Sequence, residues 1–238
     1  MNEVYENEDQ DLQNVAANAL PAERVEFIRR TYLHVAGATA IFTILLALVY
    51  SLVPLETFFN AFGKAGMLGI LVLFLGGSYL SQYLVSPSHS PATQYTGLGI
   101  YILLEVLFFW PVLAIVELKT GSLDLVYQAA LLTAAVAGGL TVATLWTRSD
   151  FSFLGPIISI ASFVALGIIV AAILFGFTLG LVFSFAMVAL MSAAILYGTS
   201  NVMYHYRTDQ YVGAALYIFS AIMTLFYWII RILLLSRR

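Results

Sequence analysis

The sequence predicts an all-α integral membrane protein, built as a bundle of seven transmembrane helices. Of its 238 residues, 61% are hydrophobic and only 10% are charged, and the mean hydropathy is +0.94. Soluble domains are about half apolar and about a quarter charged, so most of this chain cannot face water. Apolar runs of about 20 residues, the length that crosses the hydrocarbon core as a helix, recur along the chain. Membrane spans are therefore favoured over one soluble core.

Seven segments are apolar and long enough to span, and each is bounded by a turn or by charged residues. The predicted spans are 32–53, 66–85, 95–116, 123–146, 153–175, 179–199 and 211–235. The links between them are short, so there is no room for a second soluble domain. Small residues gather in the fourth span, where they let helix backbones approach closely in lipid.

The amino-terminal residues 1–20 are polar and acidic, with five of the thirteen acidic residues in the first eleven positions. We expect a disordered tail over 1–20 and a seven-helix domain over 21–238. Pro21, followed by glutamates and then by Arg29 and Arg30, predicts a helix that begins at the interface and continues into the first span. Residues 1–31 lack the basic start and short apolar run of a cleavable signal.

Composition and motifs exclude several function classes. The chain has no basic patch with interleaved aromatics, so nucleic acid is not an expected partner. It has no cysteine, which excludes disulfides and thiolate metal ligands. It also lacks the HExxH, GxSxG, P-loop and dinucleotide fingerprints. We therefore expect no enzyme activity and no cofactor. The expected partners are the lipid bilayer, calcium or another cation, and another membrane protein.

Glu105 is the most informative single residue, because it lies in the apolar run YILLEVLFFW at 101–110. A carboxylate in mid-span costs about 2.5–3.5 kcal/mol on insertion scales and is tolerated where it faces protein or water. Two interpretations follow. Glu105 is either a proton-titrating or cation-attracting group in a central cavity, which we favour, or a structural carboxyl hydrogen-bonded to a neighbouring helix.

A polar hinge at 201–210 separates the last two predicted spans and carries His205, Arg207 and Asp209. Each of these side chains could turn toward a cavity, and histidine ordinarily changes charge near neutral pH. The simpler interpretation is a solvated loop with tyrosines as interface anchors. Further residues could line a polar path with the hinge: Gln82, Tyr83, Tyr197, Tyr204 and Tyr217.

Three patches carry a resemblance to a known family. The run YVGAALYIFSAIMTLFYWIIRIL at 211–233 resembles the last helix of the transmembrane Bax inhibitor motif family, whose pattern is close to Y-x-x-A-A-L-x-L-Y-L-D-I-I-N-L-F-L-x-x-L-R. ILYGTSN at 195–201 resembles the family's I-L-Y-D-T, and 128–155 resembles its A-x-x-x-T-A-x-x-F-x-G-L-T followed by D-F-S-x-L-G. Glu105 and Pro111 match a Glu and a Pro of the third span, although Val106 replaces the Gly that usually follows the Glu.

The resemblance implies a calcium leak that is gated by two aspartates, which face each other on the last two spans and are bridged to an arginine on the second span. Two close carboxylates share a proton, which makes such a pair sensitive to pH. This chain has Gly198 and Ala221 at the aspartate positions and no arginine in 66–85. The aspartate latch is therefore absent.

We expect a calcium-leak-like cation channel or transporter, with Glu105 as the cavity carboxylate and the hinge at one mouth. The alternative is a non-conducting scaffold or regulator that binds another membrane protein. Three arginines precede the first span, which favours a cytoplasmic amino terminus. Short loops and the lack of cysteine fit a bacterial inner membrane at least as well as an endomembrane, and we expect the bacterial inner membrane. Asp150 is expected to cap the span that starts at Phe153.

Overall fold

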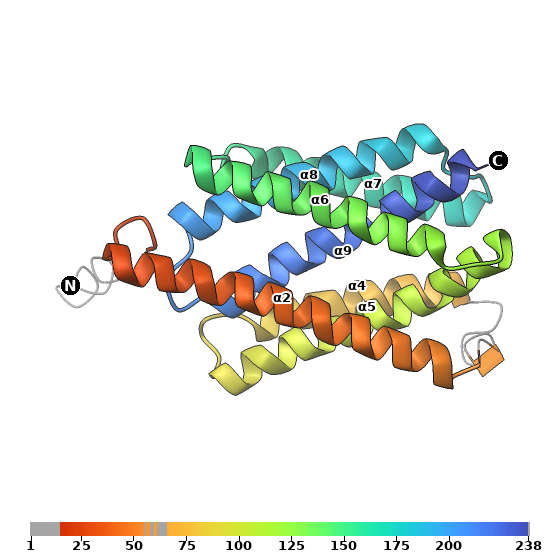
Figure 1. The fold of residues 1–238 in the computed structure, drawn as a ribbon, viewed down its shortest axis with the longest axis horizontal. Helices are drawn as coiled ribbons and strands as arrows, with labels where there is room; N and C mark the ends of the chain where they lie inside the picture. Colours follow the sequence, from red (N-terminus) through yellow and green to blue (C-terminus); the bar gives the residue numbers. More distant parts are fainter. Residues whose placement is uncertain (1–14, 55, 58–59, 61–65, 238) are drawn as a thin grey trace.

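The computed structural model describes residues 15–237, except for residues 55, 58–59 and 61–65. The described residues form seven helices, and the prediction of an all-α membrane bundle is confirmed (Figure 1). The helices are α2 (Pro21–Leu52), α4 (Gly66–Leu84), α5 (Pro91–Thr120), α6 (Asp124–Thr147), α7 (Leu154–Phe175), α8 (Leu181–Tyr204) and α9 (Tyr211–Ser236). Six of them are long and apolar enough to cross a membrane, and α4 is apolar over the shorter stretch Gly69–Leu84.

Residues at the helix ends, and not only the apolar runs, determine where several helices begin and end. Helix α2 begins at Pro21, whose fixed φ suits a first helical turn, so the expected interfacial helix and the first span are one continuous helix. Helix α5 is longer than the predicted span 95–116 at both ends. The Ser90 side chain accepts the Thr93 N–H at its start, and Gly121, with φ 75°, ends it in the left-handed conformation that glycine adopts readily.

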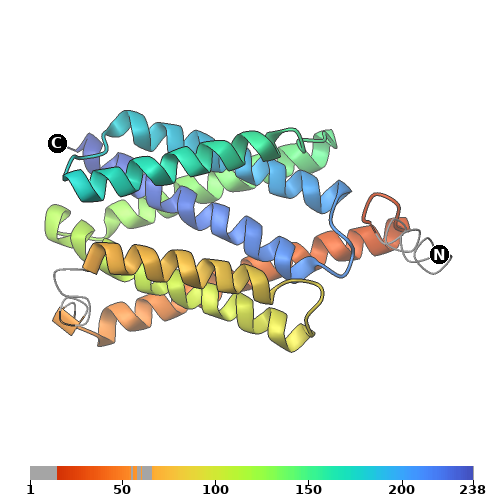
Figure 2. The same cartoon turned by 180° about the vertical axis from the view of Figure 1, so that it is seen from behind.

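Helix α9 lies in the middle of the bundle, with α4 and α5 on one side and α7 and α8 on the other (Figures 1 and 2). It contacts α2, α5, α6 and α8. Half of the residues in its most apolar stretch are buried, whereas the corresponding share in α7 is 17%. Helix α7 packs mainly on α8 and leaves most of its surface for lipid.

Helices α4 and α5 form a closely packed pair. A Cβ atom placed on Gly97 of α5 would lie 2.8 Å from the Ser81 carbonyl oxygen and 2.9 Å from the Leu84 Cβ atom of α4. Only glycine allows the two backbones to approach this closely. The carboxyl end of α4 is thereby held at a defined height beside α5.

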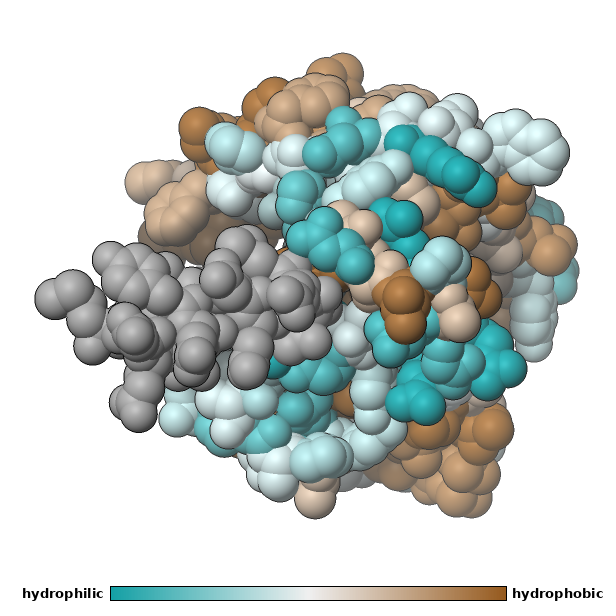
Figure 3. Space-filling model, turned by 90° about the vertical axis from the view of Figure 1, so that its left-hand side faces the viewer, coloured by the Kyte–Doolittle hydropathy of each residue, from teal (hydrophilic) through white to brown (hydrophobic). Residues whose placement is uncertain are grey.

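The amino-terminal end of the bundle is the end onto which Figure 3 looks, and hydrophilic residues spread over the middle of that face with hydrophobic ones around them. Residues 15–19 pack on this end. The Ala16 N–H donates to the Tyr206 carbonyl at 2.9 Å, and Val15 pairs with Arg207 as an isolated bridge. Ala16 is fully buried in a cluster with Phe27 and Val202. Residues 15–19 belong to the tail expected to be disordered over 1–20, but they pack on the bundle. Residues 1–14 lie outside the described residues.

Candidate functional site

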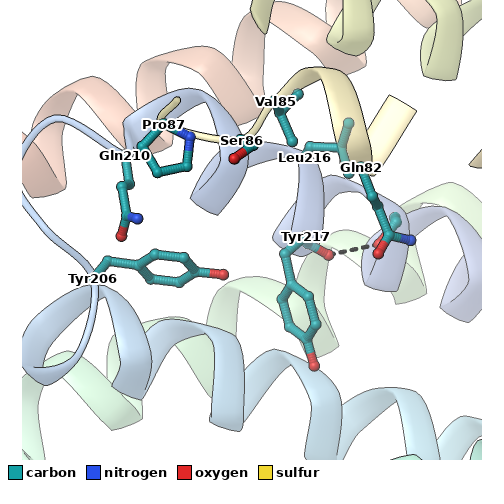
Figure 4. Close-up of a pocket in the computed structure, with 10 residues that line it drawn as sticks. Gln82, Val85, Ser86, Pro87, Tyr206, Gln210, Leu216 and Tyr217 are labelled. Atoms are coloured by element: carbon teal, nitrogen blue, oxygen red, sulfur yellow. Dashed lines mark hydrogen bonds between the residues drawn. The ribbon is translucent and has the colours of Figure 1, made fainter. Parts of the chain in front are cut away.

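A cavity of about 220 Å³ lies between the carboxyl end of α4, the turn that follows it, the hinge and the first turns of α9 (Figure 4). It is therefore at the same end of the bundle as the amino-terminal segment. Its lining residues are Gln82, Val85, Ser86, Pro87, Tyr206, Gln210, Gly213, Leu216, Tyr217 and Ser220. We call this cavity the hinge pocket.

The polar groups of the hinge pocket are neutral hydroxyls and amides. Figure 4 shows the Tyr206 hydroxyl pointing toward Tyr217 and the Gln210 side chain pointing toward Tyr206. The Gln210 Oε1 atom accepts the Arg207 N–H at 2.9 Å, which fixes that side chain in the hinge. Burial raises the pKa of Tyr206 to about 12, so its hydroxyl is uncharged at physiological pH.

Glu105 is buried in the bundle, with 2% of its surface exposed. The Tyr101 ring, one turn earlier on α5, packs edge-on to the Phe219 ring of α9, with 6.1 Å between ring centres. Ser220 lines the hinge pocket and donates its own hydroxyl to the Tyr217 carbonyl at 2.7 Å (dashed line in Figure 4). Tyr101 therefore packs beside the part of α9 that supplies Ser220 to the pocket.

The charged hinge residues predicted from the sequence are not among the pocket-lining residues. The His205 Nε2 atom lies 3.4 Å from the Asp150 Oδ1 atom in the α6–α7 link. Arg207 pairs with Asp209, with 3.3 Å between the Nε and Oδ1 atoms. Their neighbours Tyr206 and Gln210 line the pocket instead. The sequence signal for Tyr206 and Gln210 is their place in the hinge between the last two spans.

Of the five other residues expected to line a polar path, two line the pocket and three lie elsewhere. Gln82 and Tyr217 line the pocket, and Tyr197 packs edge-on to the Tyr217 ring with 5.9 Å between ring centres. Tyr204 donates its hydroxyl to the Arg148 carbonyl, and 59% of Tyr83 is exposed on the surface. In the part of the chain that the structure describes, no three His, Cys, Asp or Glu side chains are grouped as metal ligands would be.

Asp150 does not cap α7, in contrast to the expectation, because the helix begins later, at Leu154. Its Oδ1 atom accepts the Ser152 N–H at 2.9 Å and the Ser200 hydroxyl at 3.2 Å. The bond from the Ser152 N–H lowers the pKa of Asp150, so the carboxylate is charged at neutral pH. Asp150 therefore ties the α6–α7 link to the end of α8.

Gly198 of α8 and Ala221 of α9 are both buried. A Cβ atom on Gly198 would lie 2.7 Å from the Cδ1 and Cε1 atoms of the Tyr217 ring. The ring therefore occupies the space into which a side chain at 198 would project. Gly155 of α7 leaves room for the Tyr197 ring in the same way, because a Cβ atom on Gly155 would lie 2.9 Å from the Tyr197 Cε2 atom.

This packing predicts the effect of adding one methyl group at position 198. Gly198→Ala must displace the Tyr217 ring and should lower the free energy of unfolding by about 1–3 kcal/mol, the usual range for overpacking. Thermal unfolding in detergent micelles measures the change. The matched control is Gly138→Ala on α6, where an added Cβ meets nothing within 4 Å. Adding Tyr217→Ala to Gly198→Ala should remove the clash, and equal effects of the two alanines at 198 and 138 would contradict this packing.

Comparison with known sequences identifies the family of this chain. The family model described as "Inhibitor of apoptosis-promoting Bax1" matches residues 24–238. The Arabidopsis thaliana Protein LIFEGUARD 4 is 28% identical over 213 residues, which cover 87% of this chain and 83% of that protein. Protein LIFEGUARD 3 of the same plant is 25% identical over 218 residues, covering 90% and 86%. A BI1-like protein from Arabidopsis thaliana is 34% identical over 114 residues, which are 46% of this chain and less than half, 44%, of that relative. The chain therefore belongs to the Bax inhibitor family of integral membrane proteins.

Proposed function

We propose that this chain is a calcium-leak-like channel or transporter, which passes calcium or another cation across the membrane. The observation that carries the proposal is Glu105, a carboxyl that is 2% exposed and lies one turn from Tyr101, whose ring packs on the part of α9 that lines the hinge pocket. A carboxyl in mid-membrane is costly, and such residues are usually found on ion pathways. The packing of α5 on α9, the helix that lines the polar cavity, supports that role over a purely structural one.

The proposed path begins at the hinge pocket and runs inward along α9. A cation that enters the pocket exchanges part of its water shell for hydroxyl and amide oxygens, and the Glu105 carboxylate then offsets its charge in the low-dielectric interior. The family's shared-proton latch has no counterpart at Gly198 and Ala221. Opening therefore depends on movement of packed aromatic side chains such as Tyr217, which lies beside Gly198.

Glu105→Gln tests the proposal, because it keeps the shape of the side chain and removes its charge. Calcium and potassium fluxes are measured in liposomes that contain the purified protein. We expect the variant to lower the flux by at least about tenfold, which corresponds to about 1.4 kcal/mol of lost cation stabilisation.

The matched control is Glu117→Gln. Glu117 lies at the far end of the same helix, where its carboxyl accepts the Tyr50 hydroxyl. This control should conduct like the parent protein. Unchanged flux in Glu105→Gln would remove Glu105 from the path, and a folded parent protein that carries no cation at all would overturn the proposed function.

A second candidate is a non-conducting scaffold or regulator that binds another membrane protein. The observation that favours it is the Tyr217 ring, which fills the space beside Gly198 with aromatic packing. Residues 15–19 pack against the hinge, and the acidic residues of 3–11 precede them in the sequence.

Deleting residues 2–14 tests the scaffold candidate. The deletion removes five acidic residues and leaves the contact between Ala16 and Tyr206 in place. If the acidic segment is the docking element, a partner that co-purifies with the full chain from its native membrane should be lost from the shortened chain. Retention of the partner would contradict docking through this segment.

We also propose that the amino terminus is cytoplasmic and that the membrane is a bacterial inner membrane. Arg24, Arg29 and Arg30 precede the apolar part of α2, which supports a cytoplasmic start. Short links and the absence of cysteine are the basis for the choice of membrane. A single cysteine introduced at Asn18 and labelled with a membrane-impermeant reagent checks the orientation, and labelling from outside intact cells would contradict it.

A further inference from the structure

We propose that residues 15–19 form a strap that holds the hinge in place, and that release of this strap opens the hinge pocket. The inference concerns regulation of the pocket already described, and its effect on ion flux rests on the proposed function. It comes from the contacts that join the strap to the hinge, and the hinge to the lining of the pocket.

The strap binds the hinge through main-chain hydrogen bonding. The Ala16 N–H donates to the Tyr206 carbonyl at 2.9 Å, and Val15 pairs with Arg207 in an isolated antiparallel bridge. Tyr206 lies just beyond the carboxyl end of α8, so its carbonyl has no partner within a helix and accepts one from the strap. The strap therefore fixes the backbone of the hinge at two successive residues.

The helix that follows the strap holds the hinge from its other side. The Arg24 Nη2 atom of α2 donates to the Met203 carbonyl at 2.8 Å. This carbonyl belongs to the last turn of α8, where helical N–H partners are missing, and a cation there also suits the negative end of the helix dipole. The chain from the strap into α2 therefore contacts the backbone on both sides of His205.

The hinge backbone in turn positions two side chains that line the pocket. Tyr206 lines it directly, with its hydroxyl pointing toward Tyr217 (Figure 4). Arg207, which pairs with the strap, donates its N–H to the Gln210 Oε1 atom at 2.9 Å. When the strap leaves, this backbone is no longer fixed, and the Tyr206 ring is free to move away from Tyr217. Release of the strap therefore widens the pocket.

The buried anchor of the strap is small, which suits a contact that opens and closes. Ala16 is 0% exposed and packs in a cluster with Phe27 and Val202, so the buried side chain is a single methyl group. Tyr206 and Tyr217 pack against the same cluster. Segments with little buried apolar surface open at a lower cost than packed helices do. The strap therefore leaves the hinge more readily than the helices of the bundle separate.

The test combines two matched leucine substitutions with a thiol probe in the pocket. Ala16→Leu enlarges a fully buried side chain and should displace the strap, whereas Ala17→Leu makes the same change at an exposed neighbour. The chain has no cysteine, so Ser220→Cys places a single thiol in the lining of the pocket. A small uncharged methanethiosulfonate reagent should label this thiol about tenfold faster with Ala16→Leu, because the hydrogen bond and packing of the strap are lost. Ala17→Leu should leave the rate unchanged.

Two deletions test the strap without enlarging a buried side chain. Removing residues 2–19 removes the strap, whereas removing residues 2–14 leaves it in place, so labelling should be faster only in the longer deletion. Gln128→Cys on α6 is the control probe, because Gln128 pairs with Arg237 away from the pocket, and its labelling rate should be the same in every variant.

Equal labelling of the pocket thiol in Ala16→Leu and Ala17→Leu would overturn the strap, and so would equal labelling in the two deletions. If Ala16→Leu does not fold, the deletions decide. An equal rise at positions 128 and 220 would also overturn the inference, because it would show a general loosening of the bundle.

Flux measurements in liposomes separate the strap from the proposed function. Ala16→Leu should raise the cation flux above that of Ala17→Leu, because the pocket is the proposed start of the path. Faster labelling with no cation flux in any folded variant would keep the strap and overturn the proposed function. A measurable flux that is equal in both variants despite faster labelling would overturn regulation of the path by the strap.

Discussion

The packing of the central helix α9 against its neighbours is the interaction on which the rest of the structure depends. In hydrocarbon, each helix satisfies its own backbone polar groups, so the arrangement of the bundle depends on side-chain packing. Helix α9 contacts four other helices, and its Ala214 and Ala215 are fully buried. The same helix supplies Gly213, Leu216, Tyr217 and Ser220 to the hinge pocket. The position of α9 therefore determines both the core and the candidate path.

Aromatic packing replaces charge at the position where the family pattern has its facing aspartates. A carboxylate pair responds to protons, because one of its members titrates near neutral pH. The contact between Tyr217 and Gly198 depends instead on shape, and on an edge-on arrangement with Tyr197. Packing contacts change in discrete steps, since a well-filled interior cannot deform continuously. In this family member, Gly198 therefore makes a steric contact with the Tyr217 ring, where the family pattern has a carboxylate.

Hydropathy and length were sufficient to predict the bundle, because a membrane span needs about 20 apolar residues whatever its neighbours are. They could not predict helix ends that depend on caps, such as Ser90 and Gly121 of α5. Glu105 stood out as a candidate because it is a carboxyl in mid-span. Tyr206 and Gln210 did not, because nothing in a neutral loop residue indicates which way its side chain faces. For Gln210, that direction is fixed by the hydrogen bond that its Oε1 atom accepts from the Arg207 N–H.

The hydrogen bond between Ala16 and Tyr206 joins residues near opposite ends of the sequence. During synthesis, Ala16 leaves the ribosome long before the hinge exists, and it stays without this partner while the intervening helices are made. Contacts with such large sequence separation form late, because a long loop must close before they are made. Burial of Ala16 between Phe27 and Val202 is therefore an end point of assembly. A probe at this position would distinguish a completed bundle from one in which the last helix has not yet packed.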